Sequence, residues 1–159
     1  MQAVASSPHL ARLTSLEISD GYFYIGPAEV AALAASPHVG GLTALSLHNN
    51  AMGDAGLAAV ADSPRLARLT SLSLRFYGLE DPDPAFLGIE GVRALASSPH
   101  LTRLATLRLG GCRLLDEACL VLAEATNLAC LHTLDLRNNA ISDAMKGHLR
   151  ERFGGHVLF

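Results

Sequence analysis

The sequence has no tryptophan, three cysteines and a single lysine among its 159 residues. Cys112, Cys119 and Cys130 include no Cys-x-x-Cys pair, so neither a disulfide framework nor a zinc site is expected. We expect reduced thiols in a cytoplasmic protein, with Cys119 and Cys130 buried. The net charge is −3 and the arginines are scattered singly, so there is no basic stripe to follow a phosphate backbone, and nucleic acid is not an expected partner.

Long apolar runs and cofactor motifs are also missing. No apolar stretch approaches the roughly 20 residues that span a bilayer, and residues 1–12 lack the charged start and apolar middle of a signal peptide. We therefore expect no contact with a membrane. There is no Gly-x-Gly-x-x-Gly loop, no P-loop and no His-Glu-x-x-His helix, so neither a cofactor nor a metal is expected.

Internal repetition is the strongest feature that the sequence does contain. Segments that begin at Leu13, Leu42, Leu69, Leu104 and Leu131 align with one another at a spacing of 27–29 residues. The third unit is longer because residues 76–90 carry an insertion. The chain is therefore predicted to be one domain over 1–159, divided into a partial repeat 1–12 and repeats 13–41, 42–68, 69–103, 104–130 and 131–159 with a C-terminal cap.

Each repeat combines a strand pattern with a helix pattern. The opening Leu-x-x-Leu-x-Leu, with Ile18 in the last place of the first repeat, predicts a short strand with one buried face. Segments rich in alanine and leucine then predict helices over 27–35, 54–62, 90–97, 116–125 and 143–152. Asp54, Asp116 and Asp143 stand at the predicted helix N-caps. Most of the helices are expected to end at Ser-Pro, because proline cannot continue the hydrogen-bond ladder.

The segments LTALSLHNNAMGDAGLAAVA and LHTLDLRNNAISDA resemble leucine-rich repeats of the ribonuclease-inhibitor-like class, whose pattern is LxxLxLxxN. The recurring SPHLARLTSL junctions resemble those of bacterial repeat proteins. Over almost the whole chain, the resemblance implies an α/β fold. Specifically, it implies a right-handed solenoid, a horseshoe segment with a parallel sheet on its concave face and helices on its convex face.

The asparagine that closes this motif bonds neighbouring backbone groups in a ladder in the family. Here the corresponding column reads Gly21, Asn50, Tyr77, Cys112 and Asn139. Cysteine is a substitute that the family uses. Glycine and tyrosine depart from the pattern and imply irregular turns in the first and third repeats.

The two ends of the chain differ. Residues 1–7 align with the end of a helix, as though another repeat preceded them, whereas residues 157–159 offer a closing strand or an apolar lid. We therefore expect either the C-terminal part of a longer solenoid or self-association through an open N-terminal edge.

Two surfaces are candidate binding sites. The residues between the strand leucines should point outwards on the concave face, where charged and imidazole side chains gather. These are Glu17, His48, Arg75, Arg108, Asp135 and Arg137, and the cluster suits an acidic or polar partner because arginine forms bidentate contacts with carboxylates. The alternative is a solvated face without a partner. The second candidate is a rim patch, because six of the eight aromatic residues fall in two segments. Its members are Tyr22, Tyr24, Phe76, Tyr77 and Phe86, and the alternative for this patch is core filling.

These observations predict a non-catalytic module that binds another protein or a peptide. His48 with Glu17, Asp20 or Asp135 is the nearest approach to a catalytic group, but no nucleophile is placed beside it and an open sheet lacks a desolvated cleft. The alternative function is a structural or capping fragment of a larger repeat protein. Such a fragment would include the regulatory repeats of an enzyme or of a small-GTPase regulator.

Overall fold

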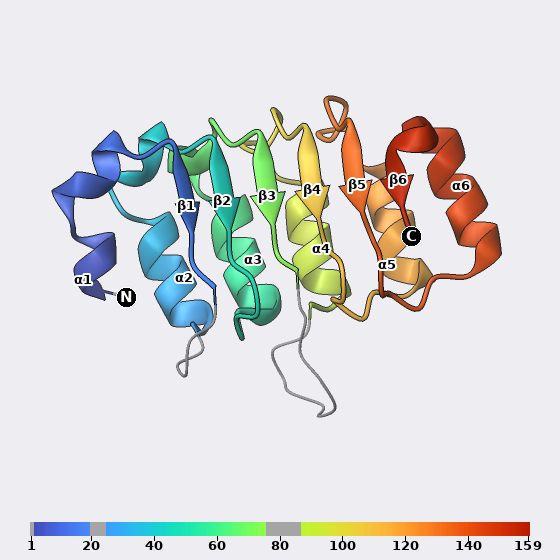
Figure 1. Cartoon of the computed structure of the whole chain (residues 1–159), viewed down its shortest axis with the longest axis horizontal. Helices are drawn as coiled ribbons and strands as arrows, with labels where there is room; N and C mark the ends of the chain where they lie inside the picture. Colours follow the sequence, from blue (N-terminus) through green and yellow to red (C-terminus); the bar gives the residue numbers. More distant parts are fainter. Residues whose placement is uncertain (1, 20–24, 76–86) are drawn as a thin grey trace.

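Short strands and helices alternate along the chain in the computed structural model (Figure 1), which describes residues 2–19, 25–75 and 87–159. The strands are β1 (Ser15–Glu17), β2 (Ala44–Ser46), β3 (Ser71–Ser73), β4 (Thr106–Arg108), β5 (Thr133–Asp135) and β6 (Val157–Leu158). The helices are α1 (Gln2–Ala5), α2 (Pro27–Ala34), α3 (Gly53–Ala61), α4 (Ile89–Ala96), α5 (Asp116–Glu124) and α6 (Asp143–Phe153). Short 3₁₀ helices are η1 (Pro8–Arg12), η2 (Val39–Gly41), η3 (Pro64–Leu66) and η4 (Gly154–His156).

All six strands belong to one parallel sheet in the order β1-β2-β3-β4-β5-β6. The middle leucine of each strand pairs with the middle leucine of the next, and Val157 of β6 continues the column beside Leu134. The helices lie behind the sheet in Figure 1, and the other face of the sheet is uncovered. The predicted α/β fold with one parallel sheet is therefore confirmed. The finer assignment to a leucine-rich-repeat solenoid stays a prediction.

The core lies between the sheet and the helices, and the repeated leucines fill it. Leu104, Leu107 and Leu109 of one repeat are all 0 % exposed, and the equivalent residues of the neighbouring repeats surround them. Burying one leucine side chain contributes about 1.5–3 kcal/mol. The residues of a single repeat are too few to bury its leucines completely. Each repeat is therefore stabilised by packing against the repeats beside it.

One buried hydrogen-bond ladder runs through the turns that follow the strands. Asn50 accepts a hydrogen bond from Ile25 N and donates to the carbonyls of Ile18 and His48. Asn139 bonds backbone groups of its own and the preceding repeat in the same way, and Cys112 donates through Sγ to the Leu74 carbonyl. These contacts satisfy backbone groups that are buried or partly buried in the turns. Gly21 and Tyr77, the two departures from the column, lie outside the described residues.

A second ladder joins the ends of the helices on the opposite side of each repeat. Ser36, Ser63 and Ser98 follow α2, α3 and α4, and each donates to the last carbonyl of the helix one repeat earlier. The three acceptors are Ala5 of α1, Ala34 of α2 and Ala61 of α3. Asn127 takes this role in the next junction, and Arg152 donates to Ala123 O in the last one. The helices α2, α3 and α4 end before the Ser-Pro pairs, as the sequence predicts.

The prediction that Asp54, Asp116 and Asp143 cap the helices is wrong. The N-cap positions are Met52, Leu115 and Ser142, so the three aspartates lie inside the first helical turns. The reason is that two of these carboxylates bond the following repeat instead of their own helix. Asp54 accepts a hydrogen bond from Gly88 N, and Asp116 accepts hydrogen bonds from the amide and hydroxyl groups of Ser142.

The C-terminal residues close the sheet. Val157–Leu158 form β6 and pair in parallel with β5, so of the two predicted alternatives, a closing strand or an apolar lid, the structure forms the strand. Val157 is buried, and the Arg150 guanidinium lies 5.0 Å from the centre of the Phe159 ring. At the other end, the outer edge of β1 has no strand partner within residues 2–19, 25–75 and 87–159. Self-association through that edge stays a prediction.

Replacing Ser98 with alanine is expected to lower the free energy of unfolding by about 1–2 kcal/mol. The change removes the donor to Ala61 O and the acceptor of the His100 and Leu101 amides in a buried junction. Urea denaturation measures the loss. The matched control is Ser97→Ala, because Ser97 is exposed and its hydroxyl bonds only carbonyls of its own helix. Equal losses in the two variants would contradict a role for the junction ladder.

Candidate functional site

The uncovered face of the sheet carries two rows of side chains that come from successive repeats. The first row lies in direct register across the strands and consists of Glu17, Ser46, Ser73, Arg108 and Asp135. The second row lies two residues further along each repeat and consists of Ser19, His48, Arg75, Gly110 and Arg137. The six residues that were predicted for the concave face all belong to these rows. Their role in binding a partner stays a prediction.

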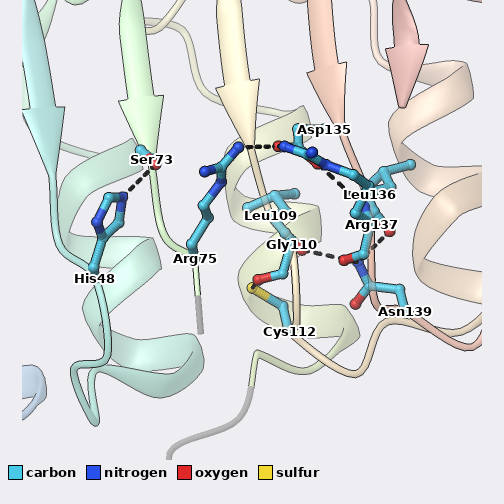
Figure 2. A network of polar contacts seen from close by, with 10 residues as sticks. All are labelled: His48, Ser73, Arg75, Leu109, Gly110, Cys112, Asp135, Leu136, Arg137 and Asn139. Carbon is cyan, nitrogen blue, oxygen red and sulfur yellow. Dashed lines mark hydrogen bonds and ion pairs between the residues drawn. The ribbon is translucent and has the colours of Figure 1, made fainter. Parts of the chain in front are cut away.

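Asp135 is the centre of the charged part of this face (Figure 2), although its side chain is only 1 % exposed. Its carboxylate accepts hydrogen bonds from Arg137 Nε at 2.9 Å and from Arg137 Nη2 at 2.7 Å. Arg75, which follows β3, reaches across β4 and donates to the same carboxylate from the other side. Asp135 is therefore held by two arginines and is largely hidden from a partner.

Gly110 makes this long reach possible. It lies between Arg75 and Arg137 in the second row, so a side chain there would stand between them. A Cβ at Gly110 would come within 3.3 Å of Arg137 O and 3.8 Å of Arg75 Cγ. The absence of a side chain leaves the space in which Arg75 crosses β4. The sequence places Gly110 in the same row as Arg75 and Arg137, but it does not show that Arg75 reaches Asp135 across it.

The pKa of the Asp135 carboxyl lies well below its ordinary range. Hydrogen bonds from the Arg137 side chain are the main cause, and those from Arg75 act in the same direction, whereas burial opposes them. The carboxylate is therefore ionised throughout the physiological pH range, and it neutralises part of the positive charge that the arginines bring to this face.

Acid is expected to remove the stability that Asp135 contributes. Its pKa is lower in the folded state than the value of about 3.9 in unfolded chains, so the contribution is complete above that value and is lost as pH falls towards the folded pKa. Urea denaturation of the wild type and Asp135→Asn should show a constant difference from pH 7 to pH 5, and a shrinking one below about pH 4. A difference that persists undiminished at about pH 2 would contradict this assignment.

His48 belongs to a second polar group on the same face. Its Nε2 atom lies 2.7 Å from Ser73 Oγ, and its Nδ1 atom lies 4.0 Å from Glu17 Oε1. Burial is the main cause that lowers the pKa of His48, and Arg75 and Arg108 lower it further, whereas Glu17 raises it. His48 is therefore predominantly neutral at pH 7 and forms a hydrogen-bonding part of the surface.

The order Ser73, His48, Glu17 has the residue types of a nucleophile, a base and an orienting carboxylate. The strand pattern of the sequence places Ser73 in the same row as Glu17, but the contact between Ser73 and His48 was not predicted. A reaction at Ser73 also needs donors aimed at the developing oxyanion. The amides of a parallel sheet lie in the plane of the sheet and bond the neighbouring strands, as Leu47 N does with Ser73 O. We therefore expect Ser73 to orient the imidazole.

A hollow of about 340 Å³ opens between these groups on β1 to β4. Polar side chains line most of it, with Glu17 at one end and Arg108 at the other. Ser46 also lines the hollow, and its buried hydroxyl has no hydrogen-bond partner in the part of the chain that the structure describes. Ser46 was not among the residues predicted from the sequence to bind a partner, although it lies in the same row as Glu17.

The aromatic rim patch cannot be placed on the structure. Its residues, Tyr22, Tyr24, Phe76, Tyr77 and Phe86, all lie outside the described residues. Asp20, one of the acidic neighbours that were considered for His48, also lies outside them. Their part in binding stays a prediction.

The cysteines are not suited to chemistry at this site. Burial raises the pKa of the Cys112 and Cys119 thiols to about 12, so neither forms the reactive thiolate at neutral pH. Cys130 is exposed, and the prediction that it is buried is wrong because it lies in the surface loop before β5. Within residues 2–19, 25–75 and 87–159, no group of three or more His, Cys, Asp or Glu side chains is arranged to hold a metal.

Comparisons with known proteins add no assignment. No protein-family model matches the chain, and no curated protein matches it in sequence. Among the described helices, none has the length and apolar character needed to cross a membrane.

Proposed function

We propose that this chain is a leucine-rich-repeat solenoid whose open sheet face binds an acidic segment of another protein or peptide. The repeat assignment is supported by the unbroken parallel register of the strands and by the turn ladder of Asn50, Cys112 and Asn139. A structure of this kind buries every repeat against its neighbours and leaves one sheet face free for contact.

The single observation that carries the proposal is the charge on the uncovered face. Arg75, Arg108 and Arg137 contribute three positive groups, against the carboxylates of Glu17 and Asp135. Asp135 is enclosed by two of the arginines, so a partner meets mainly cationic and hydrogen-bonding groups around the hollow. Arginine donors pair well with carboxylates.

The size of the face favours an extended segment as the part that makes contact. Five strands at a spacing of about 4.8 Å, each about four residues long with a rise of about 3.3 Å per residue, make a face of roughly 300 Å². A stable interface between two folded proteins needs about 800 Å² on each side. A peptide-like segment can be held on the smaller area, and a larger partner would also have to contact the rim.

One observation favours a second candidate function. The outer edge of β1 has no strand partner in the described part of the chain, so its backbone groups can accept another strand. A further repeat or a second copy of the chain would fit there. In that case the chain would extend or cap a larger array.

The test is selection of peptides from a random displayed library, followed by affinity measurement against two tyrosine variants. Ser71 lies in the hollow on β3, so Ser71→Tyr should block it and weaken binding at least tenfold. Ala59 lines the groove between α2 and α3, so Ala59→Tyr should leave binding unchanged. Circular dichroism verifies that both variants fold. Peptides that lose affinity only with Ala59→Tyr, or no enriched peptide at all, would overturn the proposal.

A further inference from the structure

Arg108 differs from the other two arginines of the open face. It is the last residue of β4, is partly buried and lines the hollow. Asp135 is its in-register neighbour on β5, but that carboxylate is directed to Arg75 and Arg137. In the described part of the chain, the Arg108 side chain forms no hydrogen bond and no ion pair. The Asp135 carboxylate is therefore already paired with the other two arginines, and the N–H donors of the Arg108 guanidinium remain available to a ligand.

Ser46 provides a second and independent observation in the same hollow. Its hydroxyl is shielded from solvent and has no hydrogen-bond partner among the described residues. Buried polar atoms of folded proteins are almost always paired, so an exception indicates a strained site or a missing ligand atom. Ser46 and Arg108 lie in the same row on either side of Ser73, about 10 Å apart at the backbone. An arginine side chain is long enough for both groups to reach one small ligand between them.

We propose that the hollow is a carboxylate site, in which Arg108 donates to a carboxylate of the bound segment and the Ser46 side chain turns towards the hollow so that its hydroxyl donates to the same group. This inference rests on the proposed function and names the chemistry that the open face recognises. The carboxylate comes from an aspartate or glutamate side chain or from a chain terminus. The hollow is large enough for such a group together with the residue that carries it.

The charges around the hollow favour a carboxylate over a phosphate. A phosphomonoester carries nearly two negative charges at pH 7 and binds best where several cations converge. Here Arg75 and Arg137 already share Asp135, and the exposed Glu17 carboxylate stands at the far end of the hollow. One guanidinium therefore matches one negative charge, and a second negative charge would face Glu17.

Binding of the carboxylate has a consequence at His48. The charged groups that face this imidazole within the described residues are Glu17 of β1, Arg75 after β3 and Arg108 of β4. A bound anion offsets the two arginines, so the pKa of His48 rises when the hollow is filled. By linkage, affinity for the carboxylate increases as pH falls through the pKa of His48.

The experiment is an NMR titration of the full ¹⁵N-labelled chain with three blocked tripeptides. The probe is acetyl-Ala-Glu-Ala-amide, the neutral control contains glutamine in place of glutamate, and the third peptide contains phosphoserine. Saturable shifts of β2 to β4 amides and an upward shift of the His48 pKa are expected with the glutamate peptide. The glutamine peptide should bind at least tenfold more weakly. Equal binding of the glutamate and glutamine peptides, or tighter binding of the phosphoserine peptide, would overturn the proposal.

Variants locate the site. Arg108→Gln should weaken binding of the glutamate peptide at least tenfold and Ser46→Ala several-fold, whereas the charge-matched control Arg103→Gln, on an exposed loop residue, should leave it unchanged. An effect of Arg103→Gln equal to that of Arg108→Gln would indicate long-range attraction and overturn the site. If Ser71→Tyr blocks the selected peptides but Arg108→Gln does not, the carboxylate site fails while the peptide-binding face stands.

Discussion

Replacing Asp135 with alanine is expected to lower the free energy of unfolding by about 2–3 kcal/mol at pH 7. The carboxylate is 1 % exposed and accepts hydrogen bonds from the side chains of Arg75 and Arg137 and from the Arg137 amide. Without it, two guanidinium groups face each other with no counter-charge between them. Removing one partner of a buried ion pair costs about 3–5 kcal/mol, and the smaller figure applies here because Arg137 is half exposed and solvent screens it.

Urea denaturation measures this loss, and Asp143 provides the matched control. Asp143 also pairs with a cation, Lys146 at 2.9 Å, but its side chain is 98 % exposed. Solvent screens such a pair and its side chains are ordered at the expense of entropy, so Asp143→Ala should leave the stability unchanged within error. If both variants lose the same stability, the effect of Asp135 would reflect net charge and not its enclosure by two arginines.

Replacing Leu107 with alanine is expected to cause the largest loss of stability, about 3–5 kcal/mol. Leu107 is 0 % exposed at the centre of β4 and pairs in register with Leu72 on one side and Leu134 on the other. The change removes buried apolar area and leaves a cavity between two neighbouring repeats. The sheet and helices on both sides of the gap hold each other in place, so they cannot collapse completely to fill it.

The matched control is Leu120→Ala, which makes the same chemical change on the outer surface of α5. Leu120 is 41 % exposed, so this variant should lose less than about 1 kcal/mol. Chemical denaturation of both variants, followed by circular dichroism, measures the difference. Similar losses at the two positions would show that the leucine columns are not the main source of stability.

The amino-acid pattern alone was sufficient for the local elements and their order. Alternation around leucines such as Leu45 and Leu134 predicted the strands, and the Ser-Pro pairs predicted where α2, α3 and α4 end. These features depend on periodicity and backbone geometry within a few residues. For the apolar segment after the last helix, the pattern left two alternatives, a closing strand or an apolar lid, and the pairing of Val157–Leu158 with β5 decided between them.

The helix caps show where local reasoning fails. Asp54 and Asp116 have the side chains of N-caps, yet their carboxylates bond the following repeat at Gly88 and Ser142. A donor more than 25 residues away competes with the amides of the same helix, and its position depends on how closely two repeats stack. The distance between two stacked repeats cannot be predicted from the local sequence pattern.

On the charged face, too, the sequence determines some features and the tertiary structure determines others. Strand periodicity was enough to place Arg108, Asp135 and their neighbours in two outward rows, because alternate residues of a strand must point to opposite faces. Folding determined which of these groups are engaged. Arg75 reaches Asp135 across the glycine of the intervening strand, 60 residues along the chain, and this leaves Arg108 with its donors available. Side-chain reach and the space between strands govern those contacts, and both exist only after the repeats have stacked.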